Sequence, residues 1–541
     1  QLVALNTSSD LVQEARERAR CDALAAGLRD DGRGLNSGGS GATAYADAIA
    51  VYLGIAISRI SSYWSSITTH DTSREKITSV FARQAIPMAW DFMEGNPFSV
   101  TSGNFLNSVE ASGKSLIQLM PRAGGSVYQS EAAHQTISNG KIVSTDPPYY
   151  DNIGYADLSD FFYVWLRRSL RTIFPDLFAT LAVPKDEELV ATPYRHGGKE
   201  NAEKFFLNGM TQAMQRISEQ THPAFPVTIY YAFKQSETDG VDGTTSTGWE
   251  TFLDAVIRAG FAITGTWPVR TEMPGRALER SGTNALASSI ILVCRPRPHD
   301  ASTITRRDFL ATLKEELPVA LAHLQRGNIA PVDLAQASIG PGMAVFTRYG
   351  KVLDATGKAL TVREALALIN ATLDEVLAEQ EGDFDAETRW ALAWFEQYGF
   401  AEGEYGVAET LSKAKNTSVS GMVGAGLLAS GSGKVRLLRP EELPATWDPT
   451  TDTRLTVWEM VHHLVRTLDK GEQVAAALIA KLGARVDIAR ELAYRLYAIC
   501  ERKKRAAEAL AYNGLVQSWP EMLRLAGEQR RDAPVQQGMD L

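Results

Sequence analysis

Four consecutive residues, Asp146-Pro147-Pro148-Tyr149, combine the groups in this chain that are best suited to chemistry. They follow the apolar stretch 141–145, and a strand that ends in a carboxylate places it where open α/β sheets bind ligands. The two prolines end the strand and stiffen the backbone, which fixes the direction of the Pro147 carbonyl. Asp146 and this carbonyl can each accept one N–H bond of an exocyclic amine, while Tyr149 offers a ring on which an extruded base can stack.

Accepting both N–H bonds would orient the lone pair of the amine nitrogen toward an electrophilic methyl group. Positioning and electrostatics can then drive an in-line displacement without a metal or a covalent enzyme intermediate. The alternative interpretation is a proline-stiffened turn in which Asp146 caps a helix. The place of the run after a strand, with further strands downstream, favours the catalytic interpretation.

The elements that must position this run are short strands that alternate with helices from about residue 116 onward. Apolar stretches rich in β-branched or aromatic residues predict these strands. The strands are expected at Ser126–Gln129, Lys141–Thr145, Pro226–Phe233, Phe261–Val269 and Ser288–Cys294. Their alternation with helices predicts a mostly parallel α/β sheet. The last two strands have no helix between them, so we expect a β-hairpin at one edge.

The region before the sheet is predicted to be helical over 9–35, 42–66 and 73–93. A Ser-Gly-Gly-Ser-Gly run at 37–41 opens the second helix, and such a run can cradle a phosphate. A dinucleotide-type loop follows a buried strand, however, and only polar residues precede this one. A plain loop with a helix cap is therefore the favoured interpretation.

The composition is that of a soluble globular protein, with 44% hydrophobic and 22% charged residues, and 541 residues correspond to roughly three to four domains. The net charge of −9 means that any nucleic-acid contact needs basic residues gathered on one face. Three scattered cysteines and the adjacent His462 and His463, which point in different directions on a helix, predict no metal site. No apolar run spans a bilayer and the first residues do not resemble a signal peptide, so we expect a cytoplasmic protein without a membrane partner.

The longer run from Asp146 to Leu166 resembles the large bacterial adenine-specific DNA methylases found beside anti-phage defence genes, whose longer members carry a zinc ribbon. Asp-Pro-Pro-Tyr is the catalytic signature of amino-directed DNA methyltransferases, and its Asp form is typical of the adenine-N6 enzymes. Further stretches are similar to this family: Arg83–Asp91, Ala191–Gly198, Trp458-Glu459 and Ala493–Tyr497. The resemblance covers most of the chain, more weakly between about 300 and 450. It implies a class I, Rossmann-like methyltransferase sheet with helical extensions.

The resemblance also implies roles for single residues. The run Asp146–Tyr149 would be the catalytic motif, and Gln129, Ser130 and Glu131 lie where the family's strand end meets the adenine ring of S-adenosylmethionine, the implied cofactor. Ser130 or Glu131 could serve as the polar partner of that cofactor. The family's glycine-rich cofactor loop is absent from this chain. We therefore expect the C-terminal portion of a longer methylase, with the loop supplied by an N-terminal region or by a partner chain.

The chain divides into five expected parts. These are a helical N-terminal part of the methyltransferase region (1–110), the catalytic core (111–298), a helical region (299–384), a winged-helix unit (385–446) and a C-terminal helical region (447–541). In the winged-helix unit we expect helices at 387–398, 407–413 and 418–426, and two strands around a Gly-Ser-Gly tip within 427–438.

The expected DNA contacts are Lys434 and Arg436 on the wing and Arg195 on the segment after the catalytic strand. Small winged units also mediate protein contacts, and for Arg195 a surface loop is the favoured interpretation beside the DNA contact.

These observations predict transfer of a methyl group from S-adenosylmethionine to N6 of a flipped adenine in double-stranded DNA, within a restriction or anti-phage defence system whose other proteins are expected partners. N4 of cytosine is the alternative target, because the motif selects an amine rather than a base. The alternative from another class is a non-catalytic DNA-binding or scaffolding subunit that keeps the fold. The missing glycine loop favours that alternative, and the intact Asp146–Tyr149 run opposes it.

Overall fold

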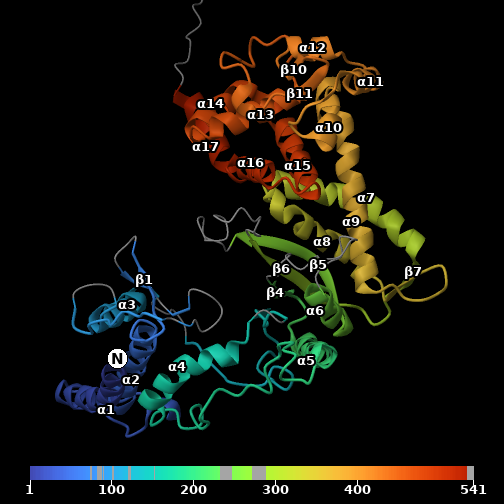
Figure 1. Ribbon diagram of the computed structural model, residues 1–541. Helices are drawn as coiled ribbons and strands as arrows, with labels where there is room; N and C mark the ends of the chain where they lie inside the picture. Colours follow the sequence, from blue (N-terminus) through green and yellow to red (C-terminus); the bar gives the residue numbers. More distant parts are fainter. Residues whose placement is uncertain are drawn as a thin grey trace, which may run out of the picture. The chain divides into compact units, whose positions relative to one another are not determined.

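The structure is a computed structural model. It describes residues 1–72, 76–78, 80–81, 88, 90–99, 103–119, 124–150, 153–231, 247–270 and 288–532. The chain forms two compact units, the first made of Gln1–Glu131 and Pro148–Phe206 and the second of Ala132–Pro147 and Leu207–Leu541 (Figure 1). The division falls between Pro147 and Pro148, inside the run that carries the predicted chemistry.

The first unit is a helical assembly around α2 (Ala42–Ser61), which buries ten of its residues. Three helices pack against it: α1 (Leu2–Ala25), α3 (Phe105–Gln118) and α4 (Tyr155–Leu170). Their shared core is formed by apolar side chains that include Leu5, Val12, Ile57, Trp64 and Leu170. Gly54 lets α4 approach closely, because a Cβ at this position would lie 3.0 Å from the Leu170 side chain.

Helix α2 is also long and apolar enough to cross a membrane, a property that the sequence analysis did not expect of any segment. In this structure 44% of its most apolar window is buried, and the helix is the central packing element of the first unit. The helix predicted at 73–93 is a further correction. Of its described residues, Lys76–Ile77 form strand β2, which pairs antiparallel with β1 (His70–Asp71), and residues 90–93 are not helical.

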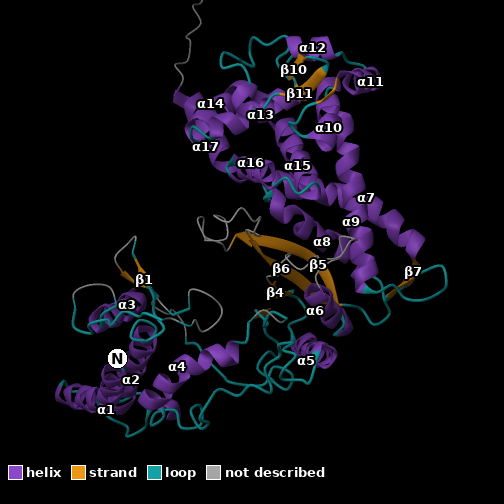
Figure 2. Ribbon diagram, viewed as in Figure 1, coloured by secondary structure: helices purple, strands orange, loops and turns teal. Residues whose placement is uncertain are grey.

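The second unit contains a four-stranded sheet in the order β3-β4-β6-β5. Figure 2 labels β4, β5 and β6. The strands are β3 (Ser144–Thr145), β4 (Val227–Tyr231), β5 (Phe261–Arg270) and β6 (Ser288–Pro296). The predicted hairpin is confirmed, since β5 pairs antiparallel with β6 and forms one edge. The prediction of a mostly parallel sheet is wrong. β6 lies between β4 and β5 and pairs antiparallel with both, and among the described strands only β3 and β4 run parallel within this sheet.

Helices α6 (Thr247–Arg258) and α8 (Pro331–Thr347) contact β5, and α7 (Arg306–Arg326) and α9 (Val362–Glu379) pack on α8. The short strands β7 (Thr303–Thr305) and β8 (Lys351–Leu353) pair in parallel beside α7. Helix α5 (Lys199–Gln220) precedes β4 and runs across the division between the units.

The C-terminal part of the second unit begins with three helices and a hairpin. The elements are α10 (Ala386–Tyr398), β9 (Gly403–Glu404), α11 (Tyr405–Lys415), α12 (Val419–Gly424), β10 (Leu428–Gly431) and β11 (Lys434–Leu437). The helices and strands predicted within 385–446 are therefore present in the expected order. Five helices follow, namely α13 (Val457–Leu468), α14 (Glu472–Leu482), α15 (Val486–Arg502), α16 (Ala506–Gln517) and α17 (Trp519–Asp532).

The expected boundary at residue 446 runs through one packed body in this structure. The Phe395 ring of α10 lies edge-on to Trp458 of α13 at 5.7 Å and to Tyr512 of α16 at 6.3 Å between ring centroids. The backbone N–H groups of Val457 and Trp458 donate to the side chains of Asp385 and Thr388. The elements from α10 to α17 therefore share a core, which we call the C-terminal body (385–532).

Candidate functional site

Asp146 lies directly after β3, at the carboxyl end of the parallel β3–β4 pair. Strand β3 is shorter than the predicted 141–145, because residues 141–143 bond to His222, which precedes β4, and to Thr228 within β4 without forming a regular ladder. His222 N donates to the Lys141 carbonyl at 3.0 Å, and Thr228 N donates to the Val143 carbonyl at 3.1 Å. The segment is thus held along the edge of the sheet up to the carboxylate.

The Asp146 side chain is exposed, while Pro147 is buried beside it. No described residue donates a hydrogen bond to the Asp146 carboxylate, so both of its oxygens are available to an external donor. Pro148 and Tyr149 belong to the first unit and are half-buried. The chain is anchored there by Tyr150, whose carbonyl accepts a 2.7 Å hydrogen bond from Ala191 N.

The predicted cofactor residues Gln129, Ser130 and Glu131 are exposed and lie outside any strand. The strand predicted at 126–129 is therefore wrong, because its apolar side chains find no sheet to pack on: Val127 is 99% exposed. These three residues belong to the first unit, whereas Asp146 belongs to the second.

The glycine run at 37–41 is a closed loop, as the plain-loop interpretation predicts. A Cβ on Gly39 would lie 2.0 Å from the Arg33 carbonyl oxygen, so the chain packs tightly on itself at this point. Thr43 N, at the start of α2, donates to Asp30 Oδ1 at 3.1 Å, and Ser40 N donates to Asp31 Oδ2 at 3.2 Å. Two carboxylates therefore occupy the positions that a phosphate cradle would leave for its ligand.

Arg195 is buried in the first unit, with 7% of its side chain exposed, and forms two ion pairs there. Its Nη2 lies 2.6 Å from Asp157 Oδ2 and its Nη1 lies 2.6 Å from Glu188 Oε2. Glu188 also accepts the backbone N–H of Ala156 at the start of α4. These bonds fasten the segment 183–195 to α4, so a DNA phosphate would have to displace two carboxylates to reach the guanidinium.

The two predicted wing contacts differ in their availability. Arg436 forms two hydrogen bonds with the Glu442 carboxylate, at 2.6 and 2.8 Å. Lys434 is half-exposed, and its Nζ lies 3.9 Å from Glu402 Oε2, which is a loose ion pair. Residues 385–446 hold six basic and eight acidic side chains, so this part of the chain has no overall positive charge.

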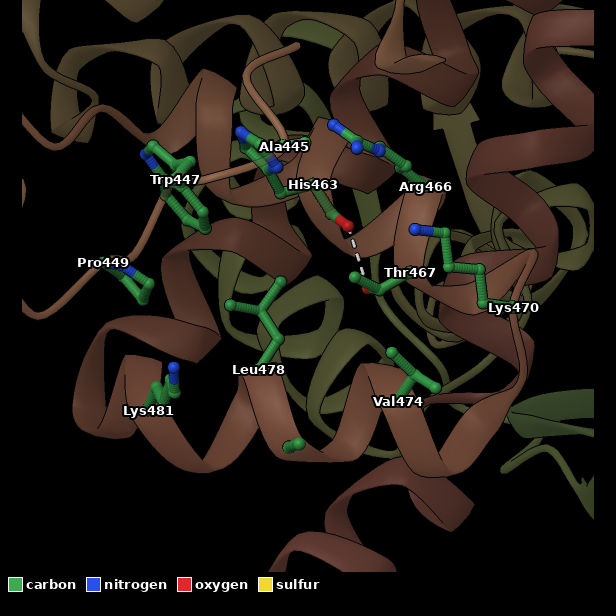
Figure 3. Close-up of a pocket in the computed structure, with 11 residues that line it drawn as sticks. Ala445, Trp447, Pro449, His463, Arg466, Thr467, Lys470, Val474, Leu478 and Lys481 are labelled. Carbon is green, nitrogen blue, oxygen red and sulfur yellow. Dashed lines mark hydrogen bonds between the residues drawn. The ribbon is translucent and has the colours of Figure 1, made fainter.

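A cleft that was not predicted from the sequence lies between α13, α14 and the segment 445–449 (Figure 3). Its lining includes Arg466 and Lys470, four residues apart at the end of α13, which was the available sequence signal. His462 and His463 point in different directions, as expected: His462 bonds to Tyr512, and His463 stacks on Trp447. Within the described chain no cluster of three side chains could hold a metal ion.

Residues 385–539 match a family model described as "Domain of unknown function (DUF8807)". This stretch begins with the C-terminal body and does not include the β3–β6 sheet. None of the curated proteins and none of the solved structures matches the chain significantly.

Proposed function

We propose that this chain contains the residues that bind the target base in an S-adenosylmethionine-dependent DNA methyltransferase, which methylates N6 of adenine. The observation that carries the proposal is the position of Asp146, an exposed carboxylate that accepts no hydrogen bond from any described residue, at the carboxyl end of a strand in an α/β sheet. That edge is the one at which α/β sheets present ligand-binding groups. The resemblance of the run from Asp146 to Leu166 supplies the reaction.

The proposed role of this site is to position the exocyclic amine of the target base. The Asp146 carboxylate accepts one N–H bond of the flipped adenine and the Pro147 carbonyl accepts the other, while Tyr149 stacks on the base. An unpaired carboxylate suits this role because it keeps both oxygens for the incoming amine. The same donors occur on cytosine, so N4 of cytosine is the second target that this geometry admits.

The residues described here do not form a cofactor pocket on their own. Gln129, Ser130 and Glu131 lie on an exposed segment without β structure, and the 37–41 loop is filled by Asp30 and Asp31. The proposal therefore requires an N-terminal region or a partner chain that supplies the glycine-rich loop and orders the segment around Ser130.

The three helices and the hairpin within 385–446 have the arrangement of a winged helix, in which α12 takes the place of a recognition helix. Helix α12 exposes Ser420 and Val423 rather than long polar side chains, so base reading by this helix is not part of the proposal. Lys434 is the wing residue that remains for a phosphate contact, because Arg436 is bound to Glu442. Arg195 is left out because of its two ion pairs.

A restriction or anti-phage defence system in the bacterial cytoplasm is the proposed setting, with double-stranded DNA as substrate and other defence proteins as partners. The second candidate is a non-catalytic DNA-binding or scaffolding subunit. It is favoured by the absence of a cofactor pocket among the described residues.

The test is the chemical identity of the methylated base. Genomic DNA from cells that express the full-length natural protein is digested and analysed by mass spectrometry, with Asp146→Ala and the exposed Asp300→Ala as the variant and its control. We expect N6-methyladenine with the wild type and with Asp300→Ala, and none above background with Asp146→Ala. Unmodified DNA in all three cells would favour the non-catalytic subunit.

A further inference from the structure

The cleft of the C-terminal body lies outside the proposed methyl-transfer site and has a chemistry of its own. Its volume is about 210 Å³, and Trp447 stands on one side and Lys470 on the other, with Leu478 between them (Figure 3). Sites for drug-sized ligands start at roughly 300 Å³. The cleft therefore suits a small group, with any remainder of the ligand extending outward.

The charge around the cleft is positive. Arg466, Lys470 and Lys481 line it. Lys481 Nζ pairs with Asp448 Oδ2 at 2.5 Å, and Arg466 donates through Nη1 to the Leu443 carbonyl at 2.6 Å. Lys470 has no ion-pair partner among the described residues. Arg466 and Lys470 therefore have no carboxylate partner among the described residues, while Asp448 pairs with Lys481 and Asp452 bonds to Trp447 on the other side of the cleft. Two neighbouring cations concentrate anions at their side of the cleft.

The opposite wall of the cleft is flat and aromatic. The indole of Trp447 stacks on the imidazole of His463 with ring centroids 4.0 Å apart and an interplanar angle of 3°. Burial lowers the pKa of His463 to about 4, so the imidazole is neutral at pH 7. Trp447 is itself held by a 2.8 Å hydrogen bond from its Nε1 to Asp452. A stacked pair fixed in this way offers a ready surface to a planar ring.

We propose that this cleft binds an aromatic phosphomonoester, with the phosphate at Lys470 and Arg466 and the ring at the Trp447 wall. A phosphomonoester carries about −1.5 to −2 charges at pH 7, which suits the two neighbouring cations Arg466 and Lys470. A carboxylate or a phosphodiester carries only one negative charge. A nucleoside 5′-monophosphate is the common biological member of this class, and the proposal does not depend on the methyltransferase assignment.

Isothermal titration calorimetry of the 541-residue chain with phenyl phosphate tests the proposal. We expect phenyl phosphate to bind more tightly than inorganic phosphate, because only the former reaches the aromatic wall. Adenosine 5′-monophosphate should bind through the same residues. Lys470→Ala should weaken phenyl phosphate at least about fivefold, since a charge-assisted hydrogen bond is lost. Trp447→Ala should remove the preference for phenyl phosphate over inorganic phosphate.

The matched control is Lys503→Ala, which removes an exposed lysine at the end of α15, away from the cleft lining. Its affinity should equal that of the wild type, and thermal unfolding followed by circular dichroism verifies that each variant is folded. Absence of phenyl phosphate binding by the wild type at millimolar concentration would overturn the proposal. So would an unchanged affinity in folded Lys470→Ala, or equal affinities of the wild type for phenyl phosphate and inorganic phosphate.

Discussion

His462 is fully buried in the C-terminal body, and both of its ring nitrogens are hydrogen-bonded. Nδ1 lies 2.7 Å from the Trp458 carbonyl oxygen, and Nε2 lies 2.9 Å from the Tyr512 hydroxyl. Burial lowers the pKa of His462 to about 4, as it does for His463. Burial has the opposite effect on the carboxyl of Glu459, whose pKa it raises to about 7.

These shifts predict that acid destabilises the C-terminal body. Between pH 6.5 and 4 the unfolded chain protonates His462 and His463 and the folded chain does not, so their contribution to stability is lost as the pH falls. For His462 this amounts to roughly 3 kcal/mol at pH 4. Glu459 acts in the other direction, because its folded pKa is raised and its contribution is lost as the pH rises from 4.5 through 7. The two histidines together change the free energy of unfolding more than Glu459 does, so the net effect of acid is destabilising.

The variant His462→Gln should therefore be less stable than the wild type at pH 7.5, and its free energy of unfolding should fall less steeply between pH 6.5 and 4.5. Urea unfolding across this pH range measures both effects. The exposed His299→Gln serves as the control and should keep the wild-type slope. An unchanged slope in His462→Gln would show that His462 titrates normally in the folded protein.

Arg195 and Arg436 illustrate which features of a site cannot be predicted from the sequence. Their charge and their place on loops or strands are visible in the sequence, and both were chosen as phosphate contacts. Their partners are not visible: Asp157 lies 38 residues before Arg195, and Glu442 reaches Arg436 only through the fold of the hairpin. The place of Asp146 directly after a strand could be predicted, because the neighbouring residues in the sequence determine it.

At the scale of elements, α8 lies unusually close to its neighbours because of two glycines. A Cβ on Gly340 would lie 2.1 Å from Thr266 Oγ1 of β5, and one on Gly342 would lie 2.5 Å from the Ile369 side chain of α9. Thr266 Oγ1 in turn donates to the Ala337 carbonyl of α8 at 2.8 Å. Helix α8 thus joins the sheet to the helices that follow it.

Gly340→Ala should destabilise the protein by about 1–3 kcal/mol, because the added methyl group overpacks the contact between α8 and β5. Gly514→Ala is the matched control, since it also places a methyl group in a helix but meets no atom within 4 Å. The control should be neutral or up to about 1 kcal/mol more stable, as alanine favours helix. Thermal unfolding compares the two variants, and equal melting temperatures would contradict the close packing.

For the wing, Lys434→Gln should weaken DNA binding equally for all sequences. It should also reduce the slope of log affinity against log salt by about one, because one phosphate contact is lost. Fluorescence anisotropy with a labelled duplex at several salt concentrations measures both quantities. Lys358→Gln, an exposed lysine outside the wing, is the control. Identical slopes for both variants would instead assign residues 385–446 to protein contact.

The elements that the sequence predicted well have strong local signals. The helices and the hairpin within 385–446 carry their own caps and turns, including the Gly-Ser-Gly tip between β10 and β11. The segment 126–129 has an apolar pattern without a neighbouring strand, and an isolated strand has no ladder to stabilise it. The sequence predicts the antiparallel pairing of β6 with β5, because no helix is expected between these two strands. It does not show that β6 also pairs with β4, so the antiparallel pairing of β4 with β6 could not be predicted.

In the whole molecule, the described residues do not form a pocket for S-adenosylmethionine, so the proposed reaction requires further residues to complete one. The 541-residue chain alone should bind S-adenosylmethionine weakly or not at all, because Ser130 lies on an exposed segment and the 37–41 loop is closed. Titration calorimetry tests this expectation. Micromolar binding by the isolated chain would show that the described residues rearrange into a complete pocket.

Methyl transfer in vitro tests the role proposed for Asp146. The full-length natural protein is incubated with unmethylated duplex DNA and S-adenosylmethionine labelled in its methyl group, and label in the DNA is counted. We predict incorporation by the wild type and by Asp300→Ala, and a loss of at least about a hundredfold in Asp146→Ala, since the amine loses the acceptor that positions it. Incorporation by Asp146→Ala within a few-fold of the wild type would contradict the assignment of this carboxylate.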